Sequence, residues 1–344
     1  MGGSRKRRAH GEVGNPDCDE RTQARVSLYE EVTAKIIAEL EAGRFPWVQP
    51  WDSGMCGGPG LPVNALTART YSGINVLLLW SAATSAGYPS QGWLTFRQAL
   101  QAGGAVRKGE KGVTVVYADR FVPEAEKARA RESEETAKTI SFLKRFTLFN
   151  VAQCEGLREG LATQNAPLPE REIIPHAEAL IAATGADFRI GGAQAYYSPG
   201  GDYVAVPPQP AFRDSVNFYR TAFHELSHWS GAGHRLGRDL SGRFGSKAYA
   251  REELCAEISA AFICAALGIA PTVRHADYVG SWLEVLREDL SQDPAIRGTA
   301  GPRGRAIFRA AGQASKAADY ILGHGEAANS LGFDPTQFRA NPHG

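Results

Sequence analysis

The strongest chemical signal in the sequence is an HExxH motif, formed by His224, Glu225 and His228. On a helix, two histidines four residues apart lie on the same face and can both bind one zinc ion. The glutamate between them can then act as a general base towards a zinc-bound water. An apolar stripe before the motif and Gly231 after it are typical of a helix that ends there. The alternative interpretation is a chance match on an ordinary amphipathic helix.

A catalytic zinc ion usually has three protein ligands, and two residues compete for the third place. His234 would complete the HExxHxxGxxH pattern of metzincins, but both methionines, Met1 and Met55, precede the motif and leave no methionine turn after it. Glu253 begins an E-x-x-A-E pattern similar to the second ligand helix of glutamate-type zincins, in which Glu257 would orient a histidine ligand. We favour Glu253 over His234. Two histidines and one carboxylate suit zinc, although manganese or cobalt can occupy such a site.

Two further features lie close to this motif in the chain. Tyr249 stands one helical turn before Glu253, where it would either polarise a substrate carbonyl or pack in the core. Residues 195–206 are typical of a β-hairpin that turns at 199–202. An edge strand beside a zinc site would let an extended peptide bind by strand addition, but a purely structural hairpin fits the sequence equally well.

Aromatic and basic side chains are interspersed in the first third of the chain. Binding single-stranded nucleic acid requires aromatic faces that stack on bases and basic groups that contact phosphates. The candidates for such a site are Trp47, Trp51, Tyr71, Trp93, Arg97, Arg107, Lys108 and Lys111, with Phe96 in the same stretch. The run 107–112 is a basic, glycine-rich turn before a strand, well placed to contact a nucleic-acid backbone. Composition alone favours the alternative, in which the aromatic residues form a core.

The elements that must position these residues are visible as periodic segments. Helices are predicted at about residues 21–42, 74–86, 94–102 and 250–267, and strands at 112–117 and 142–151. The predicted fold class is α+β with two domains: an α+β domain at 21–155 and a mainly helical domain with a small antiparallel sheet at 176–330. A basic tail (1–20), a proline-containing linker (156–175) and a C-terminal tail (331–344) complete the chain, and the charged run 124–138 receives no function.

Composition limits the possible classes of protein. The chain has 344 residues, a formal net charge of +1 and five cysteines without a CxxC pair. This sparse cysteine content fits a reducing cytoplasm and argues against disulfides or a cysteine zinc site. No apolar run reaches the roughly 18 residues of a membrane span, and no secretory signal follows the basic start. Residues 1–155 carry a net charge of +3 and the remainder −2, so the near-zero average does not exclude a local basic groove.

Several segments, in order along the chain, resemble one known family. The segments are PW…PW (46–51), PVN (62–64), YSGINVLLL (71–79), GWLTF (92–96), GGAVRKGEKG (103–112) and FNVAQC (149–154). They closely resemble the N-terminal domain of ArdC-like antirestriction proteins. Residues 224–235 and 250–268 are similar to the zincin-like metallopeptidase domain of the same proteins.

The resemblance implies a protein of conjugative plasmids or mobile elements that protects incoming DNA from host restriction. It also implies an N-terminal domain that binds single-stranded DNA. The first hypothesis joins this role to a zinc peptidase centre (His224, His228 and Glu253, with Glu225 as base) that acts on proteins near the DNA, such as host restriction components. The second is a DNA-binding module whose zinc domain is structural or regulatory, without turnover. The third is a general zinc peptidase whose first domain recruits protein.

Overall fold

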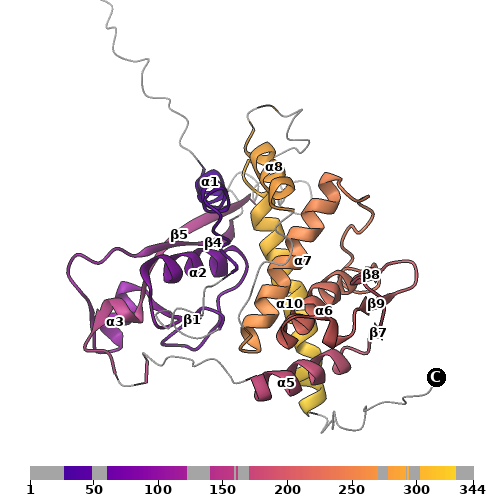
Figure 1. Ribbon diagram of the computed structural model, residues 1–344. Helices are drawn as coiled ribbons and strands as arrows, with labels where there is room; N and C mark the ends of the chain where they lie inside the picture. The colour runs from indigo at the N-terminus through magenta and orange to yellow at the C-terminus, as the bar shows by residue number, and fades with distance from the viewer. Residues whose placement is uncertain are drawn as a thin grey trace, which may run out of the picture.

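The computed structural model describes residues 27–48, 60–121, 140–158, 160–161, 170–269, 278–291, 293 and 303–330. Its elements form two groups that lie side by side, a sheet with three helices and a helical assembly with a smaller sheet (Figure 1). The first group comprises α1 (Leu28–Glu41), β1 (Val63–Asn64), α2 (Ile74–Ala86), β2 (Gly92–Leu94), α3 (Phe96–Gln101), β3 (Ala105–Val106), β4 (Val113–Phe121), β5 (Ile140–Asn150), η2 (Val151–Gln153) and β6 (Cys154–Glu155). The second comprises α5 (Glu170–Ala183), β7 (Asp187–Ile190), β8 (Tyr196–Ser198), β9 (Tyr203–Val206), η3 (Gln209–Ala211), α6 (Ser215–Ser230), α7 (Lys247–Ala266), α8 (Val279–Leu290) and α10 (Ala306–Ser330).

The N-terminal sheet has the strand order β1-β2-β5-β4, with a long antiparallel pairing of β4 and β5. Helix α2 covers one face of it, and Leu79 of this helix packs against Trp93, Val115 and Leu148 of the strands. The outer strand β4 is secured from the side by Asn75, whose amide donates to the carbonyl of Val116 and accepts from its N–H. This side chain satisfies main-chain groups of β4 that have no strand partner.

The C-terminal sheet has the order β7-β9-β8 and is mixed, which corrects the expected antiparallel sheet. The predicted hairpin is present, since β8 and β9 pair antiparallel with Tyr197 opposite Val204. Strand β7 pairs parallel with the other side of β9. The loop 191–195 carries the chain from β7 across to β8 on the far side, so β9 returns in the direction of β7 and lies between them.

Helix α7 is the centre of the helical assembly. Every residue from Glu253 to Ala265 is buried, because α6, α8 and α10 all pack against this helix. Such a helix has no solvated face, and its sequence therefore lacks a clear amphipathic period. Its acidic residues Glu253 and Glu257 are buried with the rest, and carboxylates in such a position need partners.

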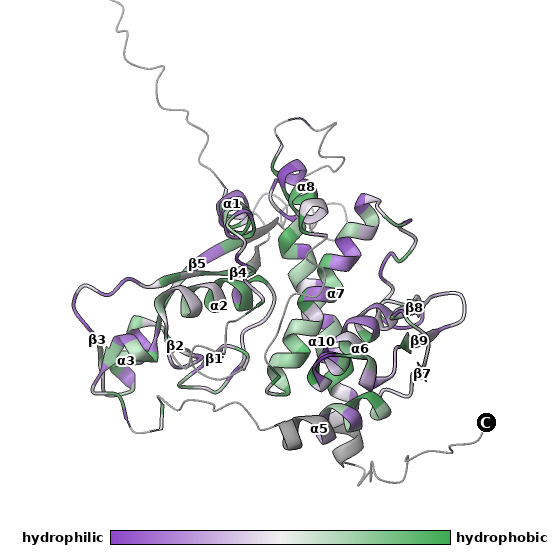
Figure 2. Cartoon of the chain, viewed as in Figure 1, coloured by the Kyte–Doolittle hydropathy of each residue, from purple (hydrophilic) through white to green (hydrophobic). Residues whose placement is uncertain are grey.

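The two groups of elements share one hydrophobic core. Trp47, after α1, packs edge-on against Trp282 of α8 with ring centroids 5.7 Å apart. Trp80 of α2 packs in the same manner against Phe262 of α7 at 5.6 Å. Figure 2 shows the apolar residues of α2 and α7 that take part in this core. The two groups are therefore joined by buried apolar contacts.

Most predicted elements agree with the structure. Helix α2 has the predicted bounds, 74–86, whereas α1 begins at Leu28 and not at about residue 21. Helix α3 is shorter than predicted because β2 takes up the first residues of that segment. Strands β4 and β5 are longer than the predicted strands. Helix α5 starts at Glu170 and contains Pro175, so a helix occupies the end of the predicted linker. Both predicted tails, the run 124–138 and residues 21–26 lie outside the described residues. Among the helices that the structure describes, none is long and apolar enough to cross a membrane.

Candidate metal centre

Helices α6 and α7 carry the candidate metal ligands. Helix α6 begins after Asp214, whose side chain accepts a hydrogen bond from Val216 N–H, and α7 begins after Ser246, which caps the N–H of Tyr249. The helices meet at two small residues, Ser227 and Ser259, whose buried hydroxyls are hydrogen-bonded at 2.9 Å. Small side chains at this point permit a close approach of the helices and bring the histidines of α6 to the carboxylates of α7.

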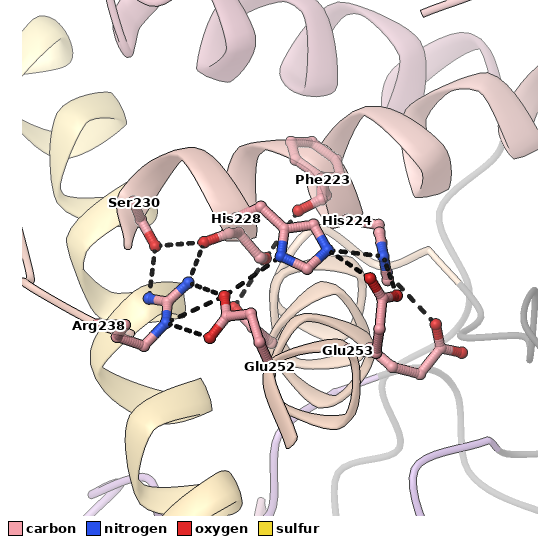
Figure 3. Close-up of polar contacts among 10 residues, drawn as sticks. Phe223, His224, His228, Ser230, Arg238, Glu252 and Glu253 are labelled. Atoms are coloured by element: carbon pink, nitrogen blue, oxygen red, sulfur yellow. Dashed lines mark hydrogen bonds and ion pairs between the residues drawn. The ribbon is translucent and has the colours of Figure 1, made fainter. Parts of the chain in front are cut away.

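His224, His228 and Glu253 converge on one point (Figure 3). Their candidate ligand atoms all lie within 4.8 Å of one another. The two Nε2 atoms are 3.2 Å apart, and the carboxylate oxygens of Glu253 lie 3.4 Å from His224 Nε2 and 3.5 Å from His228 Nε2. The competing candidate, His234, has a 64% exposed side chain and lies 3.4 Å from Asp202, outside this cluster. The geometry thus brings together the favoured set of three and leaves His234 apart.

Carboxylates lie behind both histidines. Glu257 Oε2 is 3.4 Å from His224 Nδ1, as the sequence predicted for an orienting residue. Glu252 Oε1 is 3.2 Å from His228 Nδ1 and was not predicted. Acceptors at these nitrogens fix the ring orientation and direct both Nε2 atoms at the common point.

Arg238 holds Glu252 in turn. Its guanidinium donates to both oxygens of this carboxylate, at 2.8 and 3.0 Å, and also to Ser227 O and Ser230 Oγ (Figure 3). The sequence analysis did not predict this Arg238–Glu252 pair, because it belongs to no sequence motif. The one available signal was the position of Glu252 beside Glu253, in a segment already assigned to a helix.

The charges of this cluster are strongly coupled. Burial alone would lower the pKa of His224, but hydrogen bonds to Glu253 and Glu257 outweigh it and raise the pKa to about 10. Burial would raise the pKa of Glu253, but the same interactions with His224 and His228 lower it to about 2. Without a cation, His224 is therefore protonated and paired with an ionised carboxylate. A metal ion would replace that proton as the positive charge between the three side chains.

The donor set fits a divalent metal ion. Two imidazoles and one carboxylate are ligands that zinc and similar first-row ions bind, and three such ligands leave a coordination position for a substrate or water. The cluster opens into a cavity of about 360 Å³, which Glu225 also lines. Tyr197 of β8 and Tyr249 of α7 line the same cavity. Burial and a hydrogen bond to Tyr278 raise the pKa of Tyr249, so its hydroxyl stays neutral.

Two of the aromatic residues predicted to stack on DNA are buried, which corrects that prediction. Trp47 and Trp93 have no exposed surface. Trp47 packs on Trp282 between the two groups of elements, and Trp93 lies in the core beneath α2. Neither ring offers a face to a base, because the space over it is filled by protein. Tyr71 is half-buried, and Trp51 lies outside the described residues.

The predicted basic residues are on the surface. Arg97, Lys108 and Lys111 are exposed, and so is Arg107. Arg107 is also engaged within the protein, since it pairs with Glu110 at 2.8 Å and donates to the carbonyl of Ala152 at 2.7 Å. This arginine therefore stabilises its own turn, and the other three present their charge to solvent.

An exposed aromatic residue, Phe96, lies beside these bases. Phe96 is 54% exposed and packs edge-on against Phe149, with ring centroids 6.4 Å apart. Gly112 lies directly against this pair, because a Cβ atom at this position would be 3.0 Å from Phe149 Cζ. Lys111 precedes this glycine and Arg97 follows Phe96, so one exposed ring and two cations occur together at this end of the sheet.

Known proteins share both halves of this architecture. Residues 26–149 match the N-terminal domain of the anti-restriction factor ArdC, and residues 175–296 match a zincin-like metallopeptidase domain. The metal-free crystal structure of the antirestriction ArdC protein from plasmid R388 has a TM-score of 0.69 and 38% sequence identity, and the match covers 87% of this chain and 98% of that one. This chain belongs to the ArdC antirestriction family.

Other relatives of this ArdC-family chain extend the comparison. The Mn(II)-bound structure of the R388 protein has a TM-score of 0.68, with the same identity and coverage. An uncharacterised protein, y4eC, of Sinorhizobium fredii is 41% identical over 310 residues, which are 88% of this chain and 94% of y4eC. Two DNA primases TraC of Escherichia coli are 36% and 35% identical over 86% and 88% of this chain, but the matches span only 27% and 20% of the primases. The predicted two-domain α+β fold class is confirmed.

Proposed function

We propose that this ArdC-family chain binds single-stranded DNA through its N-terminal domain and carries a zinc-dependent peptidase centre, which together protect the incoming DNA of a mobile element from host restriction. The observation that carries the proposal is the convergence of His224, His228 and Glu253 in a cavity that also contains Glu225. The proposed substrates are proteins near that DNA, such as host restriction components. We expect the protein to act in the cytoplasm, where incoming DNA meets restriction enzymes.

His224, His228 and Glu253 would hold the metal ion, with Glu257 and Glu252 orienting the two imidazoles. The Mn(II)-bound R388 relative supports a divalent ion, and the donor set favours zinc. When bound, the ion supplies Lewis acidity, which polarises a peptide carbonyl and makes water more acidic.

Glu225 is the proposed general base of the reaction. Its carboxylate lines the cavity beside the two histidines and is buried. It would accept a proton from the water that attacks the peptide carbonyl and return it to the leaving amine. Tyr249, which stays neutral, would donate a hydrogen bond to the carbonyl oxygen. Strand β8 is an edge strand beside the cavity, so an extended peptide would bind by strand addition.

The DNA-binding surface is proposed at the end of the N-terminal sheet. Phe96 would stack on bases, and Arg97, Lys108 and Lys111 would contact phosphates. In this proposal the exposed ring of Phe96 takes the stacking role that the sequence had suggested for the buried Trp47 and Trp93. The local excess of basic residues supplies the attraction that the overall net charge of +1 does not.

The test is a transformation assay with unmodified DNA in restricting and non-restricting hosts that express the wild type or Glu225→Gln. Glu225 is not one of the proposed metal ligands, so the variant is expected to keep its metal content and its DNA affinity and to lose protection. Asp187→Asn, an exposed carboxylate of the same domain, is the matched control and is expected to protect fully.

A second candidate is a DNA-binding protein whose metal site is purely structural. It is favoured by the position of the cluster, because a cation there would join α6 and α7, two helices that both contribute buried residues to the shared core. Full protection by Glu225→Gln, with metal and DNA still bound, would support this candidate and reject the peptidase mechanism.

A further inference from the structure

An exposed aromatic residue stands at the mouth of the metal cavity. Phe244 is 81% exposed, the highest exposure among the large hydrophobic residues that the structure describes. Its ring packs on Tyr249 at 5.4 Å and Tyr278 at 6.4 Å between centroids, and these two rings lie 5.8 Å apart. Both tyrosines line the cavity that contains the metal cluster. An aromatic wall therefore extends from the cavity to the surface.

The loop that carries Phe244 is fixed at two points. Arg238, before it, is held by the buried pair with Glu252. Gly242 lies directly against the start of α7, where a Cβ atom would come within 2.4 Å of Tyr249 N. Only glycine permits this approach, and it sets the path of the chain two residues before Phe244. The exposed ring is thus held over the tyrosines by its backbone.

Strand β8 contributes another part of the cavity lining. Tyr196 and Tyr197 line the cavity from this edge strand, followed by Pro199. A peptide added to β8 would therefore run along the cavity that Tyr249 and Tyr278 also line. Alternate side chains of such a strand point in opposite directions, so one of them would enter the space beside the aromatic wall.

Charge favours a peptide over nucleic acid in this cavity. Among the described residues that line it are four acidic ones, Glu225, Asp239, Glu252 and Glu253, and no lysine or arginine. Glu252 is paired with Arg238 and Glu253 with His224, but none of the described lining residues is a lysine or arginine that could bind a phosphate, whereas an uncharged apolar side chain needs no such partner. The rings offer such a side chain edge-to-face contacts and apolar surface.

We propose that Phe244, Tyr249 and Tyr278 form a binding site for an aromatic or large aliphatic side chain of a polypeptide substrate, next to the bond to be cleaved. The inference rests on the proposed peptidase function, for which it defines the class of substrate. Substrates would be cleaved where such a side chain is accessible in an extended segment. Folded proteins bury these side chains, so unfolded or loop segments would be selected.

The experiment measures binding without turnover. The full-length Glu225→Gln protein, loaded with zinc, is titrated into fluorescein-labelled ten-residue peptides that differ only in one central residue, and anisotropy gives Kd. We expect the peptides with Phe, Tyr or Leu to bind about tenfold more tightly than those with Ala or Asp, since the larger side chains bury more apolar surface. Phe244→Ala in the same background is expected to reduce this difference to less than twofold. Ile190→Ala, which changes a 63% exposed hydrophobic residue outside the cavity, is expected to keep it.

Three results of the peptide titrations would each overturn the inference. They are the absence of any peptide binding, equal Kd values for all peptides, and a preference that Phe244→Ala leaves unchanged. Competition by a ten-residue thymidine oligonucleotide that depends on Phe244 would instead assign the wall to a nucleobase, and would also overturn it. Failure of the proposed function is distinguishable: the wild type would then bind the peptides with the expected preference and not cleave them.

Discussion

Replacing Glu252 by glutamine is expected to weaken divalent metal binding by about tenfold and to destabilise the metal-free fold, because the buried guanidinium of Arg238 loses its anion. Glu252 accepts from His228 Nδ1 at 3.2 Å, and Arg238 holds its carboxylate at 2.8 Å. Burial on its own would raise the pKa of Glu252, but His228 and Arg238 outweigh it and lower this pKa, so the carboxylate is charged at neutral pH. Its charge makes the imidazole a better metal ligand.

The expected loss of metal affinity follows from the interactions that a glutamine at position 252 keeps. Loss of a residue that orients a metal ligand typically costs about 10–100-fold in metal affinity. The glutamine side chain would still offer its amide oxygen to His228 Nδ1, so the loss of metal affinity belongs at the lower end, about 1.4 kcal/mol for a factor of ten. Its NH2 group would instead face the N–H of Arg238 that now donates to the second carboxylate oxygen. Breaking this buried ion pair from either side costs about 3–5 kcal/mol of fold stability, so metal affinities are compared only between variants shown to be folded.

Competition with a chromophoric chelator at constant pH measures the metal Kd. Glu257→Gln, behind the other histidine, should lose affinity by a similar factor, and Asp187→Asn on the protein surface should not. Thermal unfolding of the metal-free variants checks that each variant is folded at the temperature of the titration. If Glu252→Gln binds metal within twofold of the wild type while Glu257→Gln is weakened, the orientation of His228 does not depend on Glu252. If both bind like the wild type, metal binding does not involve imidazoles held in this way.

Of four more predictions, two concern the metal cluster, one the DNA surface and one the core. Because the pKa of His224 is raised to about 10 in the metal-free protein, cation binding must displace its proton. Apparent metal affinity should therefore rise between pH 6 and 8.5, and calorimetry in buffers of different ionisation enthalpy should detect about one released proton per ion; no pH dependence would contradict this. The same raised pKa should stabilise the metal-free fold most below pH 6.5, with stability lost as the pH rises towards 10, as thermal melts at several pH values would measure. Lys108→Gln combined with Lys111→Gln should weaken single-stranded DNA binding and reduce the salt slope by about 1.4, measured by anisotropy between 50 and 300 mM salt; an unchanged slope would remove both residues from the interface. Trp282→Ala, which empties the space beside Trp47, should lower the free energy of unfolding by about 3–5 kcal/mol in denaturant titrations, and an unchanged midpoint would mean that the two halves are not coupled there.

Local patterns predicted the parts of the molecule that depend on local interactions. The helix of His224 and His228 and the hairpin 195–206 each follow from a run of neighbouring residues with a clear period and a clear end. The parallel pairing of β7 with β9 depends instead on the path of the loop between β7 and β8. The sequence pattern of each strand is the same in both arrangements, so periodicity could not distinguish them.

The role of an aromatic residue could not be deduced from its type and its basic neighbours. Trp47, Trp93 and Phe96 all lie in the segment with the basic residues, yet two are buried and one is exposed. Trp47 is covered by α8, which is more than 200 residues away in the chain. Burial that comes from so distant an element leaves no trace in the local sequence, whereas the neighbouring charges remained on the surface as predicted.

The carboxylates of α7 show why the same contacts serve the fold and the site. Three glutamates lie within six residues of a helix that is buried almost throughout, and each would be costly there without a positive partner. The partners come from α6 and the loop after it: His224 for Glu253 and Glu257, and Arg238 for Glu252. Glu257 and Glu252 therefore orient the imidazole rings of the two histidine ligands. Glu253 is itself a candidate ligand, and all three carboxylates add negative charge that would attract a cation. A mutation in this network, Glu252→Gln included, is thus expected to change metal affinity and stability together.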